Sequence, residues 1–274
     1  RFWTLFSTAK YDIFKKAVQS LEFFSLDRTW LPSQFLRAYV DDDYEFRGYS
    51  AKFDNEPLSN LKDFDSENQL LTVSKSLGRI DGHAIGQSSK LIFDVFTESP
   101  KLKSRLSVSG IKLKSILPNS DDYVIDDVVY SGKVTSIGNS LSAHNELLLD
   151  IQGKYKKLIE EQIEKKSRID KDSEGFISGV PVEIFSEATD TNFIELSSRI
   201  FDGRVPFKLW GIKNYTKNDF IRIRAVDLHT DGLLTFEILK DKIYCYIPTS
   251  TCGNTIVRFF VVLQQHVDSS IQMK

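Results

Sequence analysis

The fold class is decided by residues 220–267, which read FIRIRAVDLHTDGLLTFEILKDKIYCYIPTSTCGNTIVRFFVVLQQHV. Apolar and polar residues alternate there in three runs, which is the pattern of half-buried strands. The three runs are Phe220–Leu228, Leu233–Leu239 and Lys242–Ile247. The turn Thr230-Asp231-Gly232 predicts an antiparallel hairpin between the first two. The next segment, Thr255–Val267, is apolar nearly all round, so we expect a helix that is buried on more than one side.

The segment before this meander predicts two further strands and a helix between them. The strands are expected at Val180–Phe185 and Phe207–Ile212. The helix is expected to be capped by Asp190 or Thr191 and to stop at Asp202-Gly203. The order of elements is then β-α-β-β-β-β-α. The sequence therefore predicts an α+β protein whose antiparallel sheets carry helices packed on one face.

The N-terminal half mixes both periodicities. Residues 8–40 show the three-to-four-residue apolar spacing of two helices, and the period then changes to two. We expect a helix at 55–64 and strands at 44–53 (with a glycine bulge), 70–73, 91–96, 105–117 and 123–130. Gly78–Gly86, in which the glycines are four residues apart, is expected to be a mobile connection.

The domain organisation follows from one polar stretch and one long helix. Ser136–Ser142 is rich in Ser, Gly and Asn and is typical of a linker. Leu147–Ile163 then shows the apolar stripe of an amphipathic helix, with charges elsewhere around it. We therefore expect an N-terminal α+β domain at 1–140, a connecting helix and loop at 141–175, and a C-terminal α+β domain at 176–274.

Composition narrows the class of protein. The 274 residues are 41% hydrophobic and 27% charged, which suffices for a real core, and the formal net charge is −2. A dedicated nucleic-acid binder usually carries a basic excess, so nucleic acid is an alternative partner that the charge does not indicate. No run of 18 apolar residues is present, and the two cysteines form no disulfide framework. We expect a soluble, cytoplasmic and microbial protein without a cofactor.

The most specific motif is Cys252-Gly253-Asn254-Thr255-Ile256-Val257-Arg258, a Cys-x5-Arg spacing between a strand and a helix. This spacing resembles the phosphate-binding loop of phosphotyrosine phosphatases, where backbone N–H groups cradle a phosphate and the Arg grips it. Ile256 and Val257 stand where that loop is glycine-rich. The alternative interpretation is that Cys252 is a small packed side chain and that Arg258 pairs with a carboxylate.

Two other pairs of residues are weaker candidates. Asp227 and His229 lie on one strand face beside the hairpin, where acid–base chemistry or a plain structural hydrogen bond would fit. Arg222 and Arg224 place two basic groups on one strand face, as a binding surface for single-stranded nucleic acid would. The alternative interpretation is that both are ordinary solvent-facing positions of a strand. No two histidines have metal-ligand spacing, so no metal site is expected.

These observations favour a non-catalytic interaction subunit of a larger protein assembly, with other protein subunits as partners. The expected contact surfaces are the helix Leu147–Ile163 and the apolar N-terminal residues Phe2, Trp3, Leu5 and Phe6. The competing functions are a phosphate-ester-handling enzyme that uses Cys252 and Arg258, and a nucleic-acid-binding module.

Overall fold

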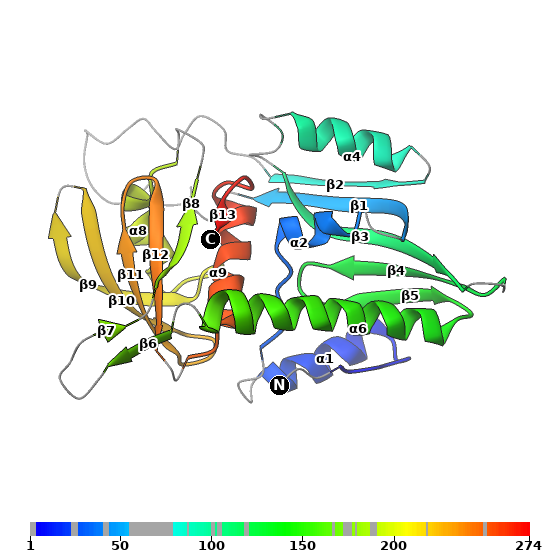
Figure 1. The fold of residues 1–274 in the computed structure, drawn as a ribbon, viewed down its shortest axis with the longest axis horizontal. Helices are drawn as coiled ribbons and strands as arrows, with labels where there is room; N and C mark the ends of the chain where they lie inside the picture. Colours follow the sequence, from blue (N-terminus) through cyan, green and yellow to red (C-terminus); the bar gives the residue numbers. More distant parts are fainter. Residues whose placement is uncertain are drawn as a thin grey trace.

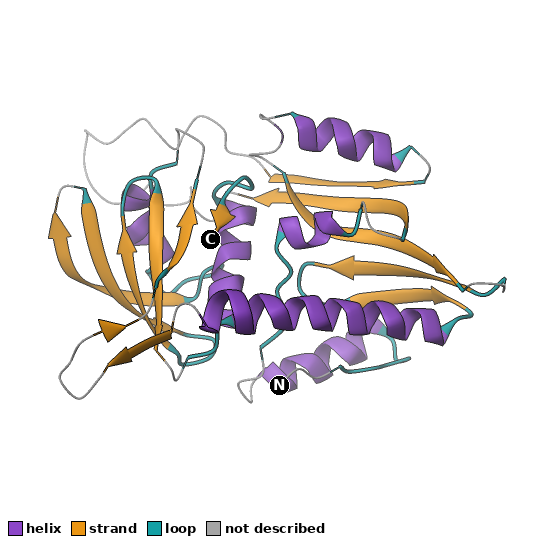
Figure 2. Cartoon of the chain, viewed as in Figure 1, coloured by secondary structure: helices purple, strands orange, loops and turns teal. Residues whose placement is uncertain are grey.

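The protein contains two antiparallel sheets with helix α9 (Asn254–His266) lying between them (Figures 1 and 2). This arrangement confirms the α+β class that the sequence predicts. No helix among the described residues is both long and apolar enough to cross a bilayer. The computed structural model describes residues 4–22, 27–40, 44–54, 79–86, 88–99, 102, 106–117, 121–165, 168–171, 177–178, 180–186, 191–217, 219–248 and 251–274.

The N-terminal sheet has five antiparallel strands in the order β2-β1-β3-β4-β5. Its strands are β1 (Glu45–Asp54), β2 (Arg79–Ile85), β3 (Ser107–Ile116), β4 (Tyr123–Val129) and β5 (Val134–Gly138). Helices α2 (Ser33–Ala38), α4 (Ser89–Glu98) and α6 (Leu141–Lys157) pack against it, and α1 (Tyr11–Glu22) precedes them in the chain. The register of β1 shifts near Gly48 and again after Ser50, so the predicted bulge is present.

The C-terminal sheet follows the order β13-β8-β12-β11-β10-β9. Its strands are β8 (Val182–Phe185), β9 (Leu209–Lys217), β10 (Phe220–Asp227), β11 (Leu233–Ile238), β12 (Lys242–Pro248) and β13 (Gln272–Met273). A short strand β6 (Arg168–Lys171) adds to β12 in parallel, and β7 (Ile177–Ser178) pairs with β6. With α8 (Phe193–Ile200) and α9 (Asn254–His266), the predicted order β-α-β-β-β-β-α is confirmed.

Helix α9 is the shared core of the two halves. Every residue from Thr255 to His266 is buried, because one side of the helix faces each sheet (Figure 1). Toward the C-terminal sheet, Phe259 packs against Phe236 with ring centroids 5.4 Å apart. Toward the N-terminal half, Gln264 Oε1 accepts a hydrogen bond from the Ser33 backbone N–H at 3.0 Å. The buried apolar residues of both sheets form one continuous cluster.

A second element spans both halves. Helix α6 continues without a break into the π-helical segment η2 (Leu158–Glu164). Its apolar stripe is buried from Leu147 to Ile163. The expected amphipathic helix is therefore present, and its apolar stripe packs inside the chain. The expectation that this helix forms a contact surface stays a prediction for its remaining faces.

Three sequence expectations fail for identifiable reasons. Within the expected mobile connection Gly78–Gly86, residues 79–85 form strand β2, which pairs with β1 along its whole length. Residues 91–96 belong to helix α4 and do not form a strand. The strand was expected because this helix is apolar on both its inner and its outer side, which makes a continuous apolar run in the sequence. The expected linker at 136–142 is instead the end of β5 and the start of α6, where Ser140 Oγ accepts a hydrogen bond from Ala143 N. The helix expected at 55–64 and the strand at 70–73 lie outside the described residues.

Two glycines provide a matched test of this packing. A Cβ at Gly211 of β9 would lie 2.5 Å from Ile223 Cγ2 and 3.0 Å from Phe201 Cβ, whereas one at Gly153 of α6 would meet nothing within 4 Å. We predict that Gly211→Ala lowers the free energy of unfolding by about 1–3 kcal/mol through overpacking. Gly153→Ala should raise it by about 0.5–1 kcal/mol, since alanine favours the helix. Urea denaturation of both variants checks this, and a neutral Gly211→Ala would contradict the packing.

Candidate functional site

The sequence-predicted residues Asp227, His229 and Arg258 meet in one buried polar cluster, which we call the junction cluster and which also contains Asp27 and Asn254. Asp227 ends β10, His229 lies in the hairpin after it, and Asn254 and Arg258 come from the first turns of α9. Asp27 comes from the segment before α2, more than two hundred residues earlier in the chain. The cluster therefore joins the N-terminal segment to the C-terminal unit.

Asp227 is fully buried, and its carboxylate accepts four hydrogen bonds. Its Oδ1 accepts hydrogen bonds from Arg258 Nη2 and from the His229 backbone N–H. Its Oδ2 accepts from Thr230 Oγ1 at 2.7 Å and from Thr255 Oγ1 at 3.1 Å. Both oxygens are thus saturated, so this carboxylate has no lone pair left over for substrate chemistry.

Asp27 completes the cluster from the N-terminal side. Its carboxylate lies 3.1 Å from His229 Nε2, 4.0 Å from Arg258 Nε and 2.8 Å from Asn254 Nδ2. Burial alone would raise the pKa of Asp27, but the hydrogen bonds from His229 and Trp30 and the charges of His229 and Arg258 lower the pKa below its ordinary value. Asp27 is therefore ionised at neutral pH.

Tyr155 ties helix α6 to the same cluster. Its buried hydroxyl donates to Asn254 Oδ1 and accepts from the Trp30 backbone N–H at 3.1 Å. Burial raises the pKa of Tyr155, which keeps the phenol neutral. Three separate parts of the chain, namely the segment before α2, helix α6 and the end of β10 with its hairpin, thus converge on the first turns of α9. The junction cluster, with two carboxylates paired to an arginine and a histidine, holds these parts together.

Cys252 lies beside the cluster, on the surface, at the start of α9. The Gly253 N–H donates to Glu164 Oε1 at 3.0 Å, so a carboxylate of the chain occupies the position where a phosphatase loop would bind phosphate. Partial burial of the thiol and the negative charges of Glu164 and Asp27 raise the pKa of Cys252, although a backbone hydrogen bond at Asn254 opposes them. Arg258 is buried and bonded to Asp227. This geometry favours the interpretation in which Arg258 pairs with a carboxylate, whereas Cys252 is exposed rather than packed.

Arg222 and Arg224 both lie on the outer face of β10, as the alternation predicts. Arg222 Nε donates to Glu237 Oε1 at 3.0 Å, and the second oxygen of Glu237 accepts from the Tyr246 hydroxyl. One of the two basic groups is therefore neutralised by a neighbouring strand. Arg224 stands opposite Thr235 and Ile212 and is exposed.

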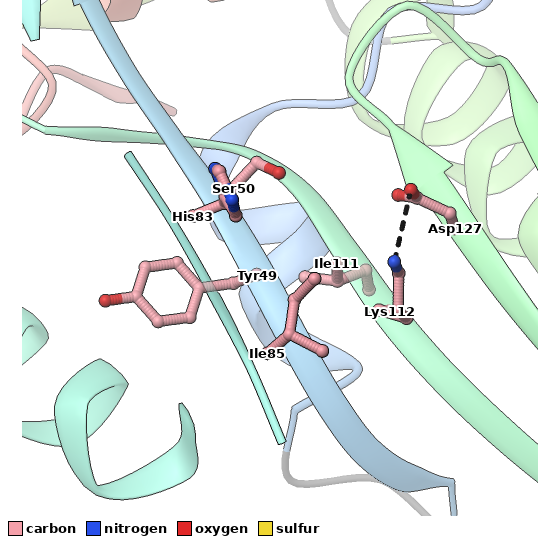
Figure 3. Close-up of a pocket in the computed structure, with 7 residues that line it drawn as sticks. All are labelled: Tyr49, Ser50, His83, Ile85, Ile111, Lys112 and Asp127. Carbon is pink, nitrogen blue, oxygen red and sulfur yellow. Dashed lines mark ion pairs between the residues drawn. The ribbon is translucent and has the colours of Figure 1, made fainter. Parts of the chain in front are cut away.

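The N-terminal sheet carries a recess of about 160 Å³ on its face, shown in Figure 3. The recess is lined by Tyr49, Ser50, His83, Ile85, Ile111, Lys112 and Asp127. Lys112 Nζ and Asp127 Oδ2 are 3.8 Å apart across β3 and β4. The Tyr49 ring points away from these polar groups and packs against Phe93 of α4. Four polar side chains from four strands therefore gather at one opening.

A third polar group lies where α6 meets the N-terminal sheet. Buried Asp126 of β4 uses Oδ1 to accept from the Ser136 hydroxyl and to contact His144 Nδ1 at 2.7 Å. Ser136 Oγ lies 2.9 Å from the same ring nitrogen. A Ser-His-Asp relay needs the hydroxyl and the carboxylate at opposite nitrogens of the ring, so this group fastens α6 to β4 and β5 instead.

Sequence reasoning missed several of these residues because their partners are distant in the chain. Asp27 joins His229, and Tyr155 joins Asn254, only through tertiary packing. One feature of the sequence indicates the recess, namely Gly110 within the alternating pattern of β3. A glycine has no side chain and therefore leaves space on the face of a sheet. Among the described residues, no group of three or more His, Cys, Asp or Glu side chains is placed to hold a metal ion.

Removing the cation of the junction cluster should be severely destabilising. Arg258→Met leaves Asp227 and Asp27 buried beside each other without their shared arginine, so we predict a loss of about 3–5 kcal/mol in the free energy of unfolding. Arg222→Met is the matched control, because that side chain is 51% exposed and its ion pair contributes about 1 kcal/mol or less. Similar small losses in both variants would show that the cluster is not a structural lock.

The raised pKa of the Cys252 thiol can be tested by alkylation. We predict slow labelling by iodoacetamide at pH 6 and a rate that rises about tenfold per pH unit toward pH 9, since only the thiolate reacts. Cys252→Ser should abolish labelling of the folded protein, because Cys245 is fully buried. A fast labelling rate that does not change between pH 6 and pH 8 would contradict a raised pKa of the Cys252 thiol and would support a reactive thiol.

The comparisons with known proteins give a family. A family model described as MJECL33-like protein matches residues 1–274. The protein MJECL33 of Methanocaldococcus jannaschii is 28% identical over 302 residues, which cover 98% of this chain and 72% of that protein. No solved structure matches the chain. The chain belongs to the MJECL33-like protein family.

Proposed function

We propose that this chain is a non-catalytic interaction subunit of a larger cytoplasmic, microbial protein assembly. The observation that carries the proposal is the outer face of α4, where Leu91, Ile92 and Val95 are 68%, 50% and 59% exposed. A helix on the surface of a monomer normally presents polar residues outward. An outward apolar face marks a surface that another protein covers.

The inner side of α4 holds this face in a fixed position. Phe93 packs on Tyr49 and Phe46 with ring centroids 5.1 and 5.5 Å apart, and Phe96 packs on Tyr49 at 5.9 Å. Lys90 Nζ also donates to the Val40 carbonyl. A partner would therefore meet an ordered surface and would lose little free energy in ordering it.

The energy available from covering this face is substantial. Fully burying one large aliphatic side chain contributes about 1.5–3 kcal/mol. Three such side chains, each at least half exposed, offer enough to anchor the centre of an interface. We propose a protein partner with a complementary apolar surface. The exposed Leu5 and Phe6 near the N-terminus form a separate and smaller apolar surface.

The two competing functions, a phosphate-ester-handling enzyme and a nucleic-acid-binding module, have less support than the interaction subunit, because most of the residues they need are already paired within the chain. Arg258 and Asp227 bond to each other, the pKa of Cys252 is raised, and Arg222 is paired with Glu237. The relative in Methanocaldococcus jannaschii supports a microbial source.

The proposal is tested by a tagged chain expressed in its native host. We expect a complex of fixed stoichiometry, sized by light scattering with its subunits identified by mass spectrometry. The double variant Leu91→Glu, Val95→Lys should release the partner, and its i,i+4 charges keep the helix stable. Leu149→Glu on α6 is the control, since Leu149 is equally exposed at 66% and lies on another helix.

Two results would contradict the proposal. One is a monomer without a stoichiometric partner in the native extract. The other is a complex that survives the α4 double variant unchanged, because the outer face of α4 would then not be the surface that binds.

A further inference from the structure

We propose that the recess on the N-terminal sheet binds a small zwitterion, namely a free α-amino acid with an aliphatic side chain. The proposal is independent of the interaction at α4 and rests on the shape of the recess and on its charged and polar side chains. The residues that carry it are Ser50, His83, Ile85, Lys112 and Asp127.

The shape of the recess comes from two glycines in neighbouring strands. Gly48 of β1 stands between Ile85 and Lys112 in the register, and Gly110 of β3 stands opposite Ser50. Directly opposed residues in a sheet share a face, so these glycines leave the middle of the lined face without side chains. A Cβ at Gly48 would lie only 2.4 Å from the Ala84 carbonyl oxygen, so this position requires glycine.

The charges of the recess select a zwitterion over a simple ion. Lys112 supplies one positive charge and Asp127 one negative charge, so neither a phosphate nor an amine alone would find a net complementary field. An α-amino acid carries both charges on groups that are attached to the same carbon atom. Its carboxylate would meet Lys112 Nζ, and its ammonium group would meet Asp127 Oδ2.

The Lys112–Asp127 pair is loose enough to accept such a ligand. The two atoms are 3.8 Å apart, beyond hydrogen-bond distance, and the side chains are 30% and 43% exposed. A solvent-exposed pair of this kind stabilises the fold little, so opening it to admit a ligand costs little. Each charge then gains a charge-assisted hydrogen bond, which is stronger than the original contact.

The remaining lining groups fit the rest of an amino acid. Ser50 and His83 are directly paired across β1 and β2, and neither side chain has a hydrogen-bond partner within the described part of the chain. Both offer polar atoms to the ligand carboxylate. Ile85 is 65% exposed at the opposite border and offers an apolar contact for an aliphatic side chain.

The structure also provides a matched control on the same strand. Lys114 lies two residues after Lys112 on the same face of β3, and its Nζ is likewise 3.8 Å from a carboxylate oxygen, that of Glu45. Lys114 is not among the residues that line the recess. The two lysines therefore differ in whether they border the recess and agree in strand, face and type of ion pair.

The experiment is a titration of the ¹⁵N-labelled chain with L-leucine, followed by amide chemical shifts. We expect saturable shifts in β1, β2 and β3 around the recess, with a Kd of about 1 mM. Lys112→Met and Asp127→Asn should each weaken binding by about tenfold or more, because each removes one charged partner. Lys114→Met should leave binding unchanged. N-acetyl-leucine and leucinamide each lack one charge. We expect each of them to bind the unchanged protein about as weakly as L-leucine binds to the Lys112→Met and Asp127→Asn variants.

Three outcomes would overturn the proposal. The first is the absence of saturable shifts with L-leucine at the recess. The second is equal binding of N-acetyl-leucine, which would show that the ammonium group is not recognised. The third is unchanged binding by Lys112→Met in a variant whose amide spectrum shows a native fold.

Discussion

The contact on which the rest of the structure depends is the buried bond between Asp227 and Arg258, with Asp27 beside it. Two carboxylates taken out of water would be unstable without a cation, and Arg258 on α9 supplies it. Because Asp27 comes from the N-terminal segment and Asp227 from β10, the same arginine fixes both to one helix. Helix α9 then places its remaining sides against the two sheets. The lowered pKa of Asp27 shows that the favourable partners outweigh the cost of burial. Residues that the sequence offers as catalytic candidates are therefore the ones that hold the fold together.

The C-terminal unit could be predicted almost element by element, because its pattern is local. Each strand of the meander alternates cleanly, and α9 is apolar all round since it has no solvent face. The N-terminal half was harder for a physical reason. Helix α4 is apolar outward as well as inward, so Leu91–Phe96 resembles a strand in sequence. Strand β2 contains three polar residues and a glycine, yet β1 pairs with it throughout. The junction cluster could be predicted only in part: Asp227 and His229 are neighbours in sequence, whereas Asp27 reaches them through the tertiary fold.

The two proposed binding surfaces lie in the half of the chain whose structure the sequence predicted less well. Both surfaces depart from ordinary patterning. The outward face of α4 is apolar and exposed. The recess, which residues of β1 to β4 line, is a part of a sheet face that has no side chains at its centre. Departures of this kind cost stability and are expected where a protein binds something. The C-terminal unit, by contrast, agrees with its local pattern at nearly every position. Its helix α9 packs against the N-terminal sheet and so holds that sheet in place.

The central claim is that α9 and the junction cluster make the two sheets one cooperative unit. Native-state hydrogen exchange, read by mass spectrometry as a function of low denaturant concentration, tests this most directly. The account predicts that the slowest amides of β3, β10 and α9 exchange together in one opening event with the same free energy. Exchange of the β3 amides at a clearly lower free energy, while those of β10 and α9 stay protected, would show two independent domains and would contradict the account.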